Sequence, residues 1–409
     1  MKIRNLFLAA LLLGGLHSFG QDGWNQHNLS GQANTPNVIT TAVPFVSIAP
    51  DARGGSMGDC GVATDPDVYS MHYNPAKYVY MEEDLSVGLG YSPWLNNLVK
   101  DMHLAYLAFQ KKLTERSALG ASLRYFDCGS IKFMDDHGND QGTYEPNEWA
   151  IDVTYSRMLG DYLAGAVAGR FIYSNLTQGQ SAYGTAQVGW SAAADIGLYY
   201  KRPVEWFSSI DADFAWGLSI TNIGSKVSYD GSSTLKDFIP TNLRVGAQLK
   251  LELDEYNTLA FTADLNKLLV PTPPIRSGAN DSILYGRDDN VSVVAGMIQS
   301  FYDAPGYSFD QNTSTYNKIG VGYEELCEIN YGVGAEYWYN KTFAVRAGYF
   351  HETALKGNRK YVTLGAALRY NVFGLDISYL IPTSNRAGTS PLENTLRFNL
   401  TYNMGKKGK

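Results

Sequence analysis

Apolar and polar side chains alternate along most of the chain. In the stretch NTLRFNLTYN, residues 394–403, four apolar side chains fall on one face of an extended backbone: Leu396, Phe398, Leu400 and Tyr402. Polar side chains occupy the positions between them, and a period of two predicts a β-strand with one apolar face. The same alternation is present in YVTLGAALRY, TNLRVGAQLKL and EWAIDVTYS, which begin at residues 361, 241 and 148.

About fourteen segments carry this pattern, and most are about 8–12 residues long, the length of a tilted strand that crosses a membrane. They lie near 85–91, 102–111, 117–126, 148–158, 162–173, 188–200, 212–223, 241–251, 257–266, 328–338, 342–351, 361–371, 373–380 and 394–403.

The connections between these segments alternate between long and short. Asn340-Lys341 and Asn371-Val372 are among the shortest, and the connection at 201–211 fits the alternation least well. An even-stranded transmembrane barrel has short periplasmic turns and long external loops. A soluble β-sandwich, the alternative, gives no reason for this sorting. The predicted fold is therefore all-β: a transmembrane antiparallel β-barrel of about fourteen strands.

The polar faces of the predicted strands carry charges of both signs near mid-strand: Arg124, Asp152, Asp195, Arg244, Asp264, Glu336, Arg346, Arg369, Asp376 and Arg397. In a barrel these side chains point into the lumen. They are either internal ion pairs that hold the barrel together or the lining of a lumenal transport path. The first interpretation is favoured, and both stay open at this point.

The composition agrees with a barrel. The chain has 29 Tyr, 17 Phe, 7 Trp and 41 Gly, and only 18% of its residues are charged. Aromatic residues gather near the predicted strand ends, as in the girdles at membrane interfaces. The net charge of -7 and the lack of a basic run before the tail Lys406–Lys409 argue against nucleic-acid binding.

The N-terminus has the pattern of a secretory signal. Lys2 and Arg4 precede an apolar run that is too short for a stable membrane anchor, and Ser18-Phe19-Gly20 has the form of a cleavage site. We expect residues 1–20 to be a cleaved signal peptide. With the predicted barrel, this indicates an integral protein of the outer membrane.

The stretch GGSMGDCGVATDPDVYSMHYNPA, residues 54–76, raises the question of a chemical site. It lacks the GK[ST] ending of a phosphate loop, and its acidic residues, Cys60 and His72 match no zinc or EF-hand spacing. A Cys60–His72 nucleophile pair is a weak alternative. Glycines suit close backbone packing, and Asn74-Pro75-Ala76 suits a helix start. Residues 21–84 are therefore predicted to be a hatch inside or beneath the barrel at 85–409.

No enzyme motif stands out elsewhere in the sequence. There is no H-E-x-x-H or C-x-x-C, and we predict no catalytic, metal or cofactor site and no enzyme activity. Outer-membrane proteases and phospholipases use similar barrels, so an enzyme remains an alternative. The pairing of Cys60, Cys128 and Cys327 stays open.

Residues 267–327 form one very long external insertion. It starts with the rigid run Pro271-Thr272-Pro273-Pro274, and Val293, Val294, Met297, Ile298 and Phe301 then fit a helical stripe. A long ordered loop of this kind is usually functional.

Three stretches resemble the PorV (LptO) family: AVPFVSIAPDARGGSMGDCGVATDPDVYSMHYNPA, GVGAEYWYNKTFAVRAGYFHE and KGNRKYVTLGAALRYNVFGLDISYLIP, which begin at residues 42, 332 and 356. That family is the FadL-like outer-membrane β-barrel of the type IX secretion system of Bacteroidetes. The resemblance implies fourteen strands and an N-terminal hatch, in agreement with the strand count.

The resemblance also implies a function that composition does not show. Such proteins bind the C-terminal signal domain of secreted cargo beside the large translocon barrel SprA (Sov). They pass the cargo to the surface sortase complex, which removes the signal and attaches the protein to lipopolysaccharide. The alternative is a FadL-type passive transporter of hydrophobic small molecules.

The predicted partner-binding residues are exposed aromatic side chains of the external loops, since aromatic anchors dominate many interfaces. They are Trp94, Phe301, Tyr302, Tyr307 and Phe309. The alternative for each residue is that it only packs the loops together.

Overall fold

The computed structural model describes residues 38–95, 99–134, 140–176, 187–207, 210–229, 236–277, 282–310, 313, 315–383, 392 and 395–406. The predicted signal peptide, residues 1–20, lies outside them, as does the beginning of the predicted hatch. The domain boundaries drawn from the sequence therefore stay predictions.

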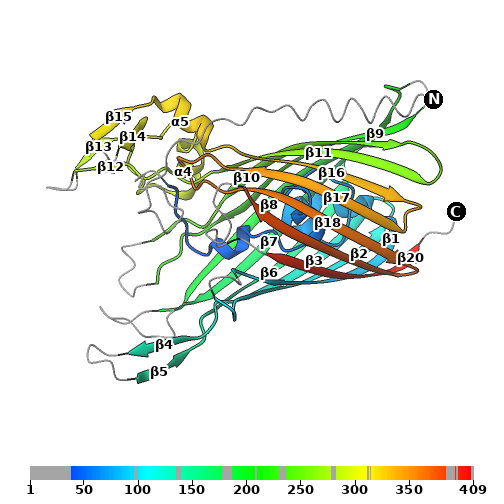
Figure 1. Cartoon of the computed structure of the whole chain (residues 1–409), viewed down its shortest axis with the longest axis horizontal. Helices are drawn as coiled ribbons and strands as arrows, with labels where there is room; N and C mark the ends of the chain where they lie inside the picture. The colour runs from blue at the N-terminus through cyan, green and yellow to red at the C-terminus, as the bar shows by residue number, and fades with distance from the viewer. Residues whose placement is uncertain are drawn as a thin grey trace. The chain divides into compact units, whose positions relative to one another are not determined.

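Within the described residues, fourteen antiparallel strands close into one barrel, with β20 paired to β1 (Figure 1). They are β1 (Glu83–Pro93), β2 (His103–Thr114), β3 (Ser117–Asp127), β6 (Asn147–Met158), β7 (Leu163–Asn175), β8 (Gly189–Val204), β9 (Asp211–Gly224), β10 (Asn242–Glu252), β11 (Asn257–Leu268), β16 (Asn330–Tyr339), β17 (Phe343–His351), β18 (Lys360–Tyr370), β19 (Phe373–Pro382) and β20 (Leu396–Lys406). Each predicted strand is present, with ends within a few residues of those expected, and the fold class is confirmed.

The connections are sorted by length between the two ends of the barrel. Tight turns such as Asn340-Lys341 and Asn371-Val372 lie at the end where β1 begins and β20 finishes. Asn340 and Lys341 have φ angles of 50° and 52°, as the twist-matched two-residue hairpin turn requires. This is the periplasmic end by the rule for outer-membrane barrels. The long connections are then extracellular.

The outer wall is apolar along its length. On β6, for example, Ile151, Val153 and Tyr155 are exposed, whereas Asp152 and Thr154 between them are buried. Exposed apolar side chains on strands of this kind face lipid in an outer-membrane barrel.

The charges predicted for the lumen are buried and mostly paired. Arg346 bonds Glu336 at 2.6 Å and Asp376 at 2.7 Å, and Arg170 joins Asp152 to Asp195. This arrangement favours the ion-pair interpretation over a transport path. Arg369 lies at a strand end with its side chain 26% exposed, and it also pairs with Asp376.

Residues 42–80 run through the lumen and are called the lumenal segment. It contains η1 (Pro44–Ser47), α2 (Ala52–Gly55), α3 (Ser70–Tyr73) and η2 (Pro75–Tyr80). Asn74 caps η2 by accepting a hydrogen bond from the Ala76 N–H, so Asn74-Pro75-Ala76 does start a helix. Towards the extracellular end, Phe45 stacks on Phe126 of the wall, with ring centroids 6.3 Å apart.

The connection between β11 and β16, residues 269–329, is called the cap. It contains β12 (Ile275–Arg276), β13 (Ile283–Tyr285), α4 (Val293–Gln299), β14 (Tyr307–Asp310), β15 (Thr315–Lys318) and α5 (Val321–Cys327). The predicted helical stripe is α4, which ends before Phe301. In the cap, β12 pairs with β13 and β14 pairs with β15. In the connection between β3 and β6, β4 (Ile131–Met134) pairs with β5 (Asp140–Tyr144). None of the described helices has the length and apolar character needed to cross a membrane.

Candidate partner-binding surface

The cap exposes many large apolar side chains beyond the barrel wall. On α4, Val294 and Ile298 are four residues apart on one helical face and are 64% and 60% exposed. On α5, Tyr323 and Leu326 are 57% and 67% exposed. These side chains lie on an extracellular connection and not on the lipid-facing strands. Exposed apolar patches occur at contact sites for proteins, membranes or ligands, so the cap is a candidate binding surface.

The five predicted partner-binding residues divide into two groups. Phe301 and Tyr302 are 50% and 45% exposed at the end of α4, and Tyr302 lies under the guanidinium of Arg287. The other three are only partly exposed. Tyr307 stacks on Tyr285 of β13, Phe309 contacts Tyr316 of β15, and Trp94 packs against the lumenal apolar cluster around Phe45. Whether any of them binds a partner stays a prediction.

A buried ion cluster fixes the cap to the barrel. Lys267, at the end of β11, lies 2.6 Å from Glu328 and 3.1 Å from Glu325. Lys356, in the loop after β17, lies 2.8 Å from Glu324 and 2.9 Å from Glu328. One lysine of the wall and one of the loop after β17 therefore hold three carboxylates of α5 and its C-terminal end, which positions α5.

Two carboxyl groups of the cap have shifted pKa values of opposite sign. Burial acts to raise the pKa of Glu328, but Lys356 and Lys267 outweigh it and hold that pKa below its usual range. Asp303 has no such partner among the causes of its shift, and burial raises its pKa to about 7. One of its oxygens accepts a hydrogen bond from the Thr272 N–H at 3.3 Å.

The lumenal segment is seated on a patch of glycines. A Cβ atom at Gly334 of β16 would lie 2.5 Å from the Met57 Cβ, and one at Gly348 of β17 would lie 2.3 Å from the Met57 carbonyl carbon. Gly58 has a φ of +68°, which favours glycine, and its oxygen would lie 2.2 Å from a Cβ at Gly332. Only a wall without side chains admits the backbone this closely.

Polar contacts hold the same segment around the barrel. Asp264 of β11 accepts hydrogen bonds from the N–H groups of Gly61 and Val62 at 2.7 and 2.9 Å. Arg124 of β3 donates to backbone oxygens of Phe45, Val46 and Ile48. The segment is thus attached to opposite parts of the wall.

The cysteine and the histidine of the stretch at 54–76 are both buried. The two ring nitrogens of His72 lie 2.9 Å from Arg124 and 3.3 Å from Arg244, which are wall residues. All three cysteines are free thiols, and Cys60 and Cys327 are buried. Among the described residues, no group of three histidine, cysteine or acidic side chains could hold a metal ion.

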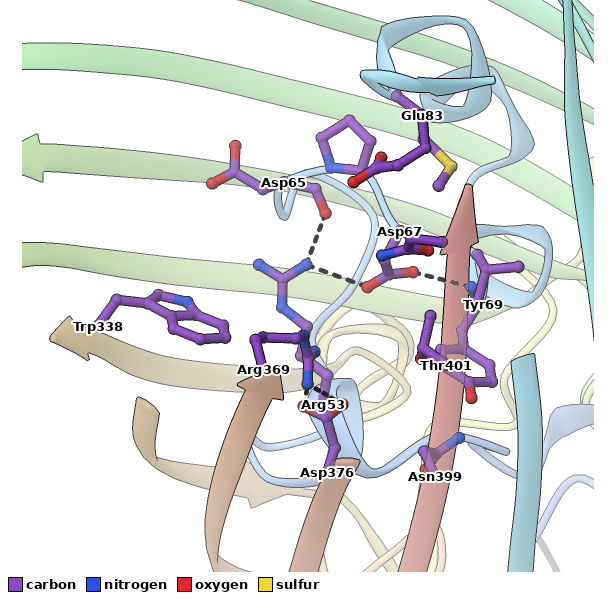
Figure 2. Close-up of a pocket in the computed structure, with 14 residues that line it drawn as sticks. Arg53, Asp65, Asp67, Tyr69, Glu83, Trp338, Arg369, Asp376, Asn399 and Thr401 are labelled. Carbon is purple, nitrogen blue, oxygen red and sulfur yellow. Dashed lines mark hydrogen bonds and ion pairs between the residues drawn. The ribbon is translucent and has the colours of Figure 1, made fainter. Parts of the chain in front are cut away.

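A cavity of about 230 Å³ lies between the lumenal segment and the periplasmic half of the wall (Figure 2). Arg53 crosses it from the lumenal segment, donating to Asp67 at 3.0 Å and to Glu336 of β16 at 2.8 Å. Figure 2 shows Arg369 and Asp376 pointing toward each other on the wall side, with Trp338 to one side. No pattern in the sequence predicted this cavity.

A family model described as "Type IX secretion system protein PorV" matches residues 30–275. The chain belongs to the PorV family. The match contains the stretch at 42–76, one of the three that carried the resemblance, together with all of the first nine barrel strands. PorV membership and the closed barrel make the chain an outer-membrane component of type IX secretion. Both features point to secretion or transport rather than to catalysis.

Several solved structures that are similar to this chain carry the names of hydrocarbon transporters or channels. The Ralstonia pickettii toluene transporter TbuX has 12% identity and a TM-score of 0.44, over 88% of this chain and 98% of that one. The Pseudomonas putida toluene transporter TodX has 10% identity and a TM-score of 0.46, over 88% of this chain and 99% of that one. A Pseudomonas aeruginosa FadL homologue has 10% identity and a TM-score of 0.39, over 90% of this chain and 99% of that one. No curated protein matches. The fold assignment rests on the strand pairing of this PorV-family chain itself.

Sequence analysis missed the residues that fix the cap. Lys267 and Lys356 are almost 90 residues apart in the chain, and neither belongs to a motif. The signal available was the acidic run at Glu324, Glu325 and Glu328, with three- and four-residue helical spacing. That spacing predicts a shared helical face, but not the lysines that meet it.

Proposed function

We propose that this PorV-family protein binds the C-terminal signal domain of secreted cargo at the translocon and passes it to the surface attachment complex. The partners would be the large translocon barrel (SprA/Sov), the cargo signal domains and the surface sortase complex. Family membership supports the secretion role, and the exposed apolar surface of the cap supports direct binding of a protein partner.

The observation that carries the proposal is that the cap exposes apolar side chains while ion pairs attach it to the barrel. Val294, Ile298 and Leu326 are each at least 60% exposed, while the α5 end of the cap is tied to β11 by Lys267. An apolar surface that is already ordered loses little conformational entropy on binding, which favours affinity. A passive transporter of hydrophobic molecules needs an open or opening lumen. The close seating of Gly58 on the wall supports binding at the cap instead.

The first test is a pull-down of the tagged protein from native outer membranes in mild detergent, followed by mass spectrometry. The proposal predicts a very large barrel protein and secreted proteins that share a C-terminal domain. A solitary barrel with only lipids or fatty acids would contradict it and would favour the transporter.

A pair of matched variants makes the pull-down specific to the cap. V294D/I298D places charges on the exposed face of α4. L253D/Y256D places the same charges on the periplasmic turn between β10 and β11, where the two side chains are 41% and 51% exposed. The cap variant should lose its partners at least tenfold, and the periplasmic variant should keep them. Equal retention by both variants would move the binding surface away from α4.

A further inference from the structure

The periplasmic end of the barrel contains a second surface, distinct from the cap. Three cavities of about 230, 420 and 310 Å³ adjoin one another here. Glu83 and Arg369 line the first two, Trp338 lines the first and third, and Lys341 lines the second and third. Together they form a space beneath the lumenal segment, here called the vestibule, which opens at the end of the short turns. It is separate from the extracellular surface, so it does not depend on the proposed function.

The inner charges of the vestibule neutralise one another. Arg53 lies 3.0 Å from Asp67, Lys250 lies 3.4 Å from Asp65, and Arg369 lies 2.8 Å from Asp376. These pairs leave little net charge at the floor of the space.

The rim of the vestibule, in contrast, is acidic. Glu82, Glu83, Glu252 and Glu255 line it, and among the described residues none of the four has an ion-pair partner. Lys341 lines two of the cavities at this rim, and Lys406 of β20 is the cross-strand partner of Glu83. An excess of carboxylates around a recess draws positively charged ligands toward it.

Unused hydrogen-bonding groups face the same space. Asn399 and Asn403 of β20 line the first cavity, and Asn399 is 1% exposed. Within the described residues, Asn399 Nδ2 has no acceptor and Asn403 Oδ1 has no donor. A buried polar group without a partner is costly, so a ligand or water that supplies one is favoured.

We propose that the vestibule binds an extended, lysine- or arginine-bearing segment of a periplasmic protein. The rim attracts the basic side chains, while Asn399 offers a donor and Asn403 an acceptor to peptide C=O and N–H groups. The two asparagines are four residues apart on one strand, roughly 13 Å, which matches about four residues of an extended peptide.

The test is the binding of a fluorescent hexalysine peptide to the protein in nanodiscs, followed by anisotropy. Binding should weaken at least tenfold in E82Q/E83Q/E252Q/E255Q, and it should weaken as salt rises. N403A should weaken it a few-fold without changing the salt dependence. D288N/D289N, which removes exposed carboxylates of the cap, should leave it unchanged. The heat-dependent gel shift of a folded barrel checks that each variant is folded.

Three results would overturn the proposal. Hexalysine could fail to bind, hexaglutamate could bind as well as hexalysine, or the cap control could lose as much affinity as the rim variant. A chain lacking residues 407–409 provides one more test. If it binds hexalysine tenfold more tightly than the full chain, the protein's own basic tail is the occupant and not a partner.

Discussion

The lumen and the cap place charged and apolar side chains in opposite ways. In the lumen, charges such as Arg346, Glu336 and Asp376 are buried and paired, and the lumenal segment lies against bare glycines. In the cap, apolar side chains such as Ile298 and Leu326 face water, and the charges lie underneath, where Lys267 and Lys356 hold α5. The arrangement in the lumen fills the barrel, and the arrangement in the cap exposes an apolar surface to water. The difference supports the proposal that cargo binds at the cap.

The largest effect is expected where the lumenal segment meets the wall. Gly348→Leu would drive a side chain into the Met57–Gly58 backbone, which has no room to yield. We expect the folded barrel to be lost, or the segment to be displaced, at a cost of about 3 kcal/mol or more. The measurement is the heat-dependent gel shift combined with trypsin cleavage at Arg53.

The matched control for that change is Gly169→Leu on β7. Gly169 is exposed on the outer wall, and a Cβ there meets no atom within 4 Å. This variant should fold normally. Equal damage by the two substitutions would mean that glycine is needed for strand formation and not for seating the segment.

The next prediction compares the loss of unfolding free energy when a buried ion pair and an exposed ion pair are broken. Arg346→Met removes the buried cation that Glu336 and Asp376 share. Glu336 keeps Arg53 and Asp376 keeps Arg369, so the loss should be about 1.5–3 kcal/mol of unfolding free energy. Arg276→Met breaks a cap pair with Asp289 in which both side chains are more than a third exposed, and should cost below about 1 kcal/mol. Urea unfolding in detergent measures both. Similar costs would remove the distinction between lumen and cap.

A smaller effect depends on pH and is confined to the cap. Burial raises the pKa of Asp303 to about 7, whereas an unfolded aspartate titrates near ~3.9. The fold therefore favours the protonated form. The contribution of Asp303 to the stability of the cap should be greatest below about pH 4 and should fall as the pH rises towards 7.

Asp303→Asn tests that pH dependence because it keeps a neutral side chain of the same shape. At pH 8 its cap should resist thermolysin better than the wild-type cap, and near pH 5 the difference should shrink. Asp288→Asn, at a cap position where the side chain is 62% exposed, is the control and should show no such trend. A cap whose protection does not change with pH would contradict the burial argument.

The smallest expected effect on folding is at the exposed face of α4. V294D/I298D should change the unfolding free energy by less than about 0.5 kcal/mol per site, because neither side chain is buried. Calorimetry or urea unfolding checks this. A large loss of stability would show that α4 packs against its own chain and is not a free surface.

Much of the barrel could be predicted from the sequence because lipid and a polar lumen impose a period of two. Ile151, Asp152 and Val153 show why: each side chain must satisfy one of two very different environments. The even strand number and the sorted turn lengths followed from the same constraint. The internal charges were predicted as a group, but which cation meets which carboxylate depends on strand register.

The cap was predicted less well. α4 was visible as a helical stripe, but β12 to β15 are only two to four residues long and leave no readable period. Tyr307 and Phe309 were predicted as anchors, yet they lie against Tyr285 and Tyr316, because aromatic side chains in short hairpins pack on each other. The vestibule joins Glu83, Trp338 and Asn399, which only strand closure brings together.

The measurement that tests the central claim most directly is the binding of a purified cargo C-terminal domain to the protein in nanodiscs. Wild type and L253D/Y256D should bind equally, and V294D/I298D should bind at least tenfold more weakly while unfolding like the wild type. If V294D/I298D binds as well as the wild type, the exposed face of α4 is not the cargo surface and the account is contradicted.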